Sequence, residues 1–144
     1  MLHPIYKAIK QQLTTADVDG QLKGIEKYNL QYQGTISTAP RVFIEFPDKL
    51  EINRLTKQEK RLPLPIRLHV VSKAMARTDG VIVDEVVEAH EQLALWVKDQ
   101  LEGFEATDGG TKLASRLQWS GWQEFPKYKD WLVTHIYFDC KKAL

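Results

Sequence analysis

Four histidines and one cysteine are the residues of this chain best suited to hold a metal ion. A zinc-protease helix needs a second histidine four residues after the first, and four residues after His90 stands Ala94. A di-iron helix needs an acid three residues before its histidine, and Val87 stands there. Cys140 has no cysteine or histidine at metal-ligand spacing. The sequence therefore predicts no metal site and no cofactor, and His90 is expected to be a hydrogen-bonded core or interface histidine.

Other catalytic patterns are incomplete. Residues 109–112 have the composition of a phosphate-binding loop but lack Gly-Lys followed by Ser or Thr. Ser120 lacks the glycine two residues before it that a nucleophile elbow requires. A metal-dependent nuclease could begin at Asp48, but residues 66–73 offer Lys73 and no acid. We therefore expect a protein that is not an enzyme, and an enzyme of unrecognised type is the alternative.

The composition is that of an ordinary globular protein. The chain has 144 residues, enough for one domain with its own core and too few for two. Lys plus Arg number 20 and Asp plus Glu number 19, and this near balance gives no general case for nucleic-acid binding. The single cysteine cannot form an internal disulfide, and we recognise neither a signal peptide nor a membrane-spanning run. We expect a single domain over residues 1–144 in a reducing cytoplasm, with no membrane contact.

The clearest predicted element is an amphipathic helix over residues 83–103. Its opposite face is acidic and includes Glu85, Glu88 and Glu91. A shorter helix is expected over residues 4–13. The long helix lies between apolar strands, so it must cover a sheet. Its apolar stripe, at helical spacing, consists of Val83, Val86, Val87, His90, Leu93, Ala94, Val97 and Leu101.

Alternation of apolar and polar residues predicts the strands of that sheet. Pro63 and Pro65 cannot donate to a ladder, so the start of the strand that holds them should lie at a sheet edge or be unpaired. Strand runs separated by single helices predict an α+β fold, a mixed and mostly antiparallel sheet with both helices packed on one face. The expected strands cover residues 24–32, 41–46, 62–72, 113–120 and 131–140, with a hairpin over 50–60, a loop over 103–112 and a loop over 121–130.

Two segments carry opposite local charge. Residues 83–103 are strongly acidic, whereas residues 48–61 are basic. Two solvated faces would explain this pattern, and the alternative is a contact between the two patches in neighbouring subunits. The basic candidates for such an interface are Lys49, Arg54, Lys57, Lys60 and Arg61, and the acidic ones are Glu85, Glu88 and Glu91.

Five aromatic residues fall within 13 positions, Trp119, Trp122, Phe125, Tyr128 and Trp131. They could hold the loop over residues 121–130 against the sheet. Alternatively, Trp122, Phe125 and Tyr128 could contact a partner, because Trp and Tyr are favoured anchors of protein interfaces. An alternative function is therefore that of a small intracellular protein-binding module with an aromatic surface at residues 119–131.

The order of the predicted elements resembles the tail terminator (tail completion) proteins of tailed bacteriophages and prophages. The resemblance covers nearly the whole chain. It rests on a short first helix, the strand Pro-Arg-Val-Phe-Ile-Glu-Phe-Pro at residues 40–47, a charged hairpin leading into residues 62–72, one long helix and two closing strands.

This resemblance implies a ring, usually of six subunits, that caps the tail tube and joins it to the head. The implied partners are further copies of the chain, the tail tube protein and a head-completion protein, and DNA passes through without specific binding. Such a protein assembles in the bacterial host cytoplasm, ends in the virion tail, and has no catalytic residues. The hairpin at residues 49–61 would reach a neighbouring subunit or the tube. The acids of helix 83–103 would meet that hairpin or face the channel and repel DNA phosphates.

Overall fold

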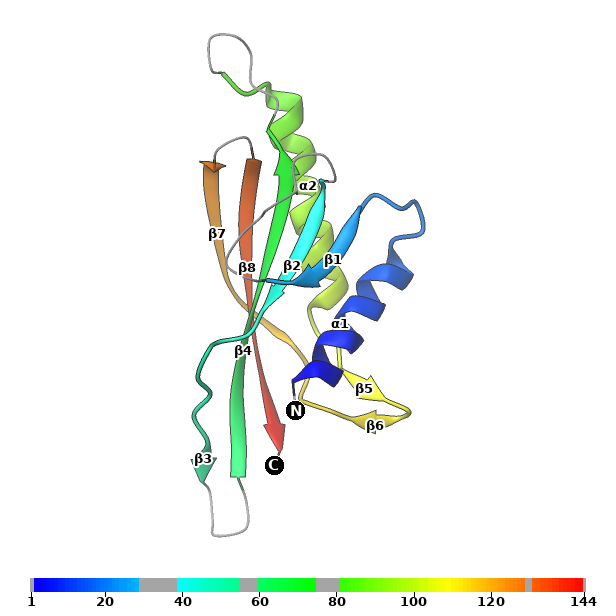
Figure 1. Cartoon of the computed structure of the whole chain (residues 1–144), viewed down its shortest axis with the longest axis vertical. Helices are drawn as coiled ribbons and strands as arrows, with labels where there is room; N and C mark the ends of the chain where they lie inside the picture. The colour runs from blue at the N-terminus through cyan, green and yellow to red at the C-terminus, as the bar shows by residue number, and fades with distance from the viewer. Residues whose placement is uncertain (1, 29–38, 55–59, 75–80, 129–130, 144) are drawn as a thin grey trace.

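The computed structural model describes residues 2–28, 39–54, 60–74, 81–128 and 131–143 (Figure 1). Two helices and eight strands lie in these ranges. In chain order they are α1 (His3–Ala16), β1 (Gly24–Lys27), β2 (Arg41–Glu45), β3 (Asn53–Arg54), β4 (Lys60–Lys73), α2 (Asp84–Leu101), β5 (Thr107–Asp108), β6 (Thr111–Lys112), β7 (Gln118–Tyr128) and β8 (Trp131–Ala143).

The central sheet is mixed and mostly antiparallel, as predicted. Its strand order is β1-β2-β4-β8-β7, with β3 paired to the start of β4. Only β1 and β2 run parallel among these pairs. The longest pairing joins β4 to β8, from Arg61 opposite Ala143 to Lys73 opposite Trp131. This pair of strands is the long axis of the molecule in Figure 1.

Both helices pack on one face of the sheet, which confirms the predicted α+β arrangement (Figure 1). The predicted stripe of α2 is buried from His90 onward, but Val83 is 37% exposed. Val83 is the residue that precedes the helix, and its extended backbone turns its side chain out of the stripe. The core residues that the helices contribute are Ile5, Ile9 and Leu13 from α1, and Leu93, Ala94, Val97 and Leu101 from α2.

The two prolines of β4 lie at an open edge, as predicted. Pro63 is opposite Lys141, whose backbone N–H and C=O are both bonded to Ser115. Lys141 therefore points these groups away from β4, and the nitrogen of Pro63 points away from β8. Pro65, two residues on, has the same orientation. On the edge of β4 away from β8, β3 pairs only with residues 60–61 and β2 only with residues 67–71. No described strand lies opposite the two prolines there, so their missing N–H groups cost no hydrogen bond between strands.

The predictions for residues 113–128 are wrong in part, because the expected strand over 113–120 overlaps β7 only at residues 118–120. Residues 113–117 form no strand, and β7 occupies most of the expected loop. Trp119, in the part of the expected strand that is present, is 42% exposed. Gly121 read as a loop residue, but it lies in β7, where a Cβ would be 3.2 Å from the ring of Tyr137. The pairing of β7 with β8 is irregular on both sides of residues 121–125, which weakened the alternation.

The structure differs from the predicted elements in three smaller ways. The expected loop over residues 103–112 contains the β5–β6 hairpin, whose turn uses Gly109 and Gly110 at positive φ. β1 ends at Lys27, and residues 29–32 of the expected strand lie outside the described residues. The expected hairpin over residues 50–60 is present as β3 paired with β4, and its tip at residues 55–59 also lies outside them.

Candidate interaction surfaces

The basic hairpin projects from one end of the molecule. We call β3 and residues 60–66 of β4 the arm; it forms the lower end of Figure 1, below the helices. Of the predicted basic residues, Lys49, Arg54 and Arg61 are exposed and Lys60 is half-buried, whereas Lys57 lies outside the described residues.

The cations of the arm are placed against one another. Arg54 is directly opposite Lys60 in the β3–β4 pairing, and like charges in such a position destabilise a pair of strands. In the part of the chain that the structure describes, none of Lys49, Arg54, Lys60 and Arg61 forms an ion pair. Other basic residues do, such as Arg67 with Glu45 at 3.4 Å and Lys98 with Asp99 at 2.7 Å. The arm therefore presents cations that form no ion pair with any described residue.

The acidic residues of α2 lie at the other end of the molecule. Glu85, Glu88 and Glu91 are all exposed near the start of the helix, which is at the top of Figure 1. His90 is bonded to Ser72 of β4, and the strand from Ser72 back to Lys60 spans about 40 Å at its usual rise per residue. The acidic and basic candidates cannot touch within one molecule, so a contact between them would join two copies.

His90 is a hydrogen-bonded core histidine, which confirms one of the two predicted roles. Its Nδ1 lies 2.7 Å from Ser72 Oγ and its Nε2 lies 2.8 Å from Thr134 Oγ1. Burial lowers the pKa of His90 to about 4, against a smaller opposing effect of Glu124. The ring is therefore neutral at pH 7 and joins α2 to β4 and β8.

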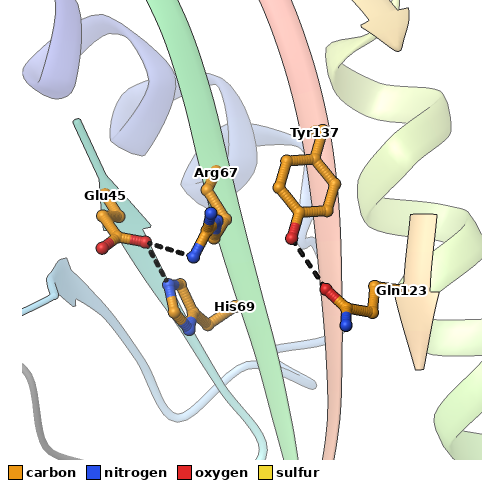
Figure 2. Close-up of polar contacts among 5 residues, drawn as sticks. All are labelled: Glu45, Arg67, His69, Gln123 and Tyr137. Atoms are coloured by element: carbon orange, nitrogen blue, oxygen red, sulfur yellow. Dashed lines mark hydrogen bonds and ion pairs between the residues drawn. The ribbon is translucent and has the colours of Figure 1, made fainter. Parts of the chain in front are cut away.

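The sheet face opposite the helices, here called the helix-free face, carries a polar cluster that the sequence analysis missed (Figure 2). Glu45 Oε1 of β2 accepts from His69 Nε2 at 2.9 Å and pairs with Arg67 Nη1 at 3.4 Å, both from β4. On β8, the Tyr137 hydroxyl donates to Gln123 Oε1 of β7 at 2.9 Å. The Arg67 guanidinium lies 4.9 Å from the centre of the Tyr137 ring and so links the two groups.

Rings surround this cluster. His69 stacks on Tyr28 at 4.0 Å between centroids and lies 4.1 Å from His135, which in turn lies 4.6 Å from Phe125. Burial and the Arg67 charge lower the pKa of His69 to about 3, and burial, then His69 and Arg67, lower that of His135 to about 4. A histidine with so low a pKa is a poor general base at neutral pH. The hydrogen bonds of the cluster join β2 to β4 and β7 to β8.

The predicted aromatic candidates do not share one surface. Trp122 packs against the helix-side core, whereas Phe125 packs against the buried cluster of the helix-free face. The backbone of Tyr128 is paired with Trp131, and Trp131 is buried. Trp119 lies beside Trp122 at 6.3 Å between ring centroids.

The described residues offer no arrangement for metal chemistry. Among them, no three or more His, Cys, Asp or Glu side chains converge. Cys140 is buried in the helix-side core, and burial together with Asp139 raises the pKa of its thiol to about 11. It fills core space as a small apolar side chain does. No helix in the described ranges has the length and apolar character needed to cross a membrane.

Comparisons with known proteins identify a fold. No protein-family model matches the chain, and no curated protein matches it in sequence. Among solved structures, a chain of the virion of a native gene transfer agent particle superposes with a TM-score of 0.62. The match covers 97% of this chain and 95% of that one, at 13% sequence identity. The two chains share the same fold over almost their whole length.

Proposed function

We propose that this protein is a non-enzymatic structural component of a phage-like particle, with the role of a tail terminator. The observation that carries the proposal is the match to a virion chain over 97% of the residues, at a TM-score of 0.62. The tail-terminator resemblance of the element order points in the same direction. In this role the chain is a single α+β domain that assembles in the bacterial host cytoplasm and ends in the virion tail.

The charge distribution supports a ring. The cations of the arm and the acids of α2 lie at opposite ends of the molecule. Complementary patches at two ends generate a head-to-tail contact, and such contacts close into a ring when the rotation between copies allows it. The ring, of six copies by resemblance, would cap the tail tube and receive a head-completion protein.

The same acids have a second possible place, at the wall of a central channel. Exposed carboxylates there would repel DNA phosphates and keep passing DNA from binding. A position in the interface and a position in the channel predict different results when the three carboxylates are removed. Removing the charges of Glu85, Glu88 and Glu91 weakens assembly if they lie in the interface, and leaves assembly intact but increases DNA retention if they line the channel.

The proposed role is tested by adding the purified protein to polymerising tail tube protein. A terminator shortens the tubes in proportion to its concentration and is found at one tube end by electron microscopy. Cross-linking of the protein alone should give a ladder of multimers that ends at the ring. Tubes of unchanged length, with a protein that cross-links only as a monomer, would contradict the proposal.

A second candidate function is that of a protein-binding module, and one observation favours it. β7 is an edge strand of the sheet, and its residue Trp119 is 42% exposed although its ring contacts Lys98 and Trp122. A Trp119→Ala variant would then lose a partner protein while ring assembly is unchanged. Quenching of tryptophan fluorescence by acrylamide gives a first readout, because a partner protein that covers this edge would reduce the quenching of Trp119.

A further inference from the structure

A hollow lined by basic residues lies beside the arm, at the end of β4 that contains Arg61. It has a volume of about 460 Å³ and is formed by the start of β4, the end of β8, β6 and the segment that follows β6. Leu113 and Ala114 provide apolar surface inside it. Its charged lining is entirely positive and consists of Arg61, Lys112, Lys141 and Lys142.

Most of this charge has no counterion in the described chain. Lys112 pairs with Glu105 at 3.4 Å, whereas Arg61, Lys141 and Lys142 form no ion pair with a described residue. Lys142 donates from Nζ to the carbonyl of Leu113 at 3.2 Å, which holds its ammonium group at the wall. Gathering four cations around one concave surface raises the local potential and favours an anionic occupant.

The chain itself carries a surface of the matching chemistry. Glu85, Glu88 and Glu91 recur every three residues on α2, so their carboxylates lie close together on the exposed side of the helix. They too form no ion pair among the described residues. A nucleic-acid phosphate is the competing occupant, but proteins that bind nucleic acid are usually strongly basic, and this chain has a net charge of +1.

We infer that the basic hollow of one copy receives the acidic start of α2 from the next copy. This inference rests on the proposed function, because it supplies the head-to-tail contact of the ring. It assigns a role to Lys112, Lys141 and Lys142, which the sequence analysis did not single out, and it places the arm beside the contact. An electrostatic contact of this kind weakens as salt concentration rises.

The test is a charge swap with two variants. The hollow variant is Arg61→Glu/Lys141→Glu/Lys142→Glu, and the helix variant is Glu85→Lys/Glu88→Lys/Glu91→Lys. A third variant, with Lys7, Lys10 and Lys23 each changed to Glu, reverses as many exposed charges elsewhere and serves as the control. Circular dichroism and thermal melting establish that each variant is folded, and light scattering measures its assembly.

Each swapped variant alone should assemble more than tenfold more weakly than wild type, and the control should not. An equimolar mixture of the two swapped variants should regain assembly, because alternating copies restore opposite charges at every contact. A hollow variant that assembles like the control, or a mixture that stays dissociated, would overturn the inference.

Two other outcomes are separable. If the hollow variant assembles normally but loses binding to a short duplex DNA, the hollow is a phosphate site and the inference is wrong while the ring stands. If the wild-type protein never assembles and does not shorten tail tubes, the proposed function itself fails.

Discussion

His90 and Thr134 are 44 residues apart in sequence, and the 2.8 Å contact between Nε2 and Oγ1 ties the middle of α2 to β8. On the other side of the ring, Ser72 of β4 completes the arrangement at 2.7 Å. One neutral side chain thus satisfies two hydroxyl groups between the long helix and the two longest strands.

Replacing His90 by Ala should lower the free energy of unfolding by about 3 kcal/mol. The change leaves a cavity and removes a partner from each of two hydroxyl groups at the helix–sheet boundary. Urea denaturation followed by circular dichroism measures the loss, with the exposed Gln92→Ala on the same helix as the control. A loss no larger than that of the control would show that the His90 bonds contribute nothing to stability.

Stability should fall between pH 7 and pH 4. The pKa of His90 is lowered from 6.5 to about 4 in the folded state, so below pH 6.5 the unfolded chain takes up a proton that the folded chain does not. The contribution of the neutral His90 to the free energy of unfolding is complete above pH 6.5 and is lost as pH falls toward 4. At pH 5 the loss from His90 alone is about 2 kcal/mol.

His69 and His135, whose pKa values are also lowered, add to this loss in the same direction. Urea midpoints measured across this range give the profile. The urea midpoint of a His90→Gln variant should change less with pH than that of the wild-type protein. Stability that stays constant from pH 7 to pH 5 would be incompatible with neutral buried histidines.

Cys140 should be unreactive in the folded protein. Its thiol is 5% exposed, its pKa is raised to about 11, and only the thiolate attacks a disulfide reagent. At pH 8, reaction with Ellman's reagent should be slow without urea and rapid once urea unfolds the chain. Fast labelling under native conditions would place the thiol at the surface instead of in the core.

Lys60→Glu should change stability and assembly in opposite directions. Because Lys60 is directly opposite Arg54, the variant exchanges a like-charge pair for an ion pair and stabilises the arm by a few tenths of a kcal/mol. The same change removes a cation from the proposed interface and should weaken assembly. Thermal melting and light scattering on one sample measure both effects. Undiminished assembly would remove Lys60 from the interface.

The elements whose apolar residues recur at a regular spacing could be predicted from the sequence. The stripe of α2 and the alternation of β4 are set by burial on one face, and that pattern is visible in a single sequence. β7 was missed because its irregular pairing with β8 breaks the alternation, and because Gly121 reads as a turn residue until the Tyr137 ring beside it is known.

The candidate surfaces were predicted only in part. The charges of the arm and of α2 are local in sequence, so they were found, but their placement at opposite ends depends on how β4 and α2 pack. The cluster of Glu45, Arg67 and His69 depends on the register between β2 and β4. Charged and aromatic residues alternate with the buried ones on β4, and this alternation indicated a second face of the sheet. It did not identify the neighbouring strand that supplies their partners.

The central claim is that this protein acts through self-assembly into a ring, and its mass in solution tests this most directly. Light scattering during size-exclusion chromatography, over a range of protein concentrations, should give a defined multiple of the chain mass, six by resemblance, with no larger species. A mass of one chain at every concentration would contradict the account.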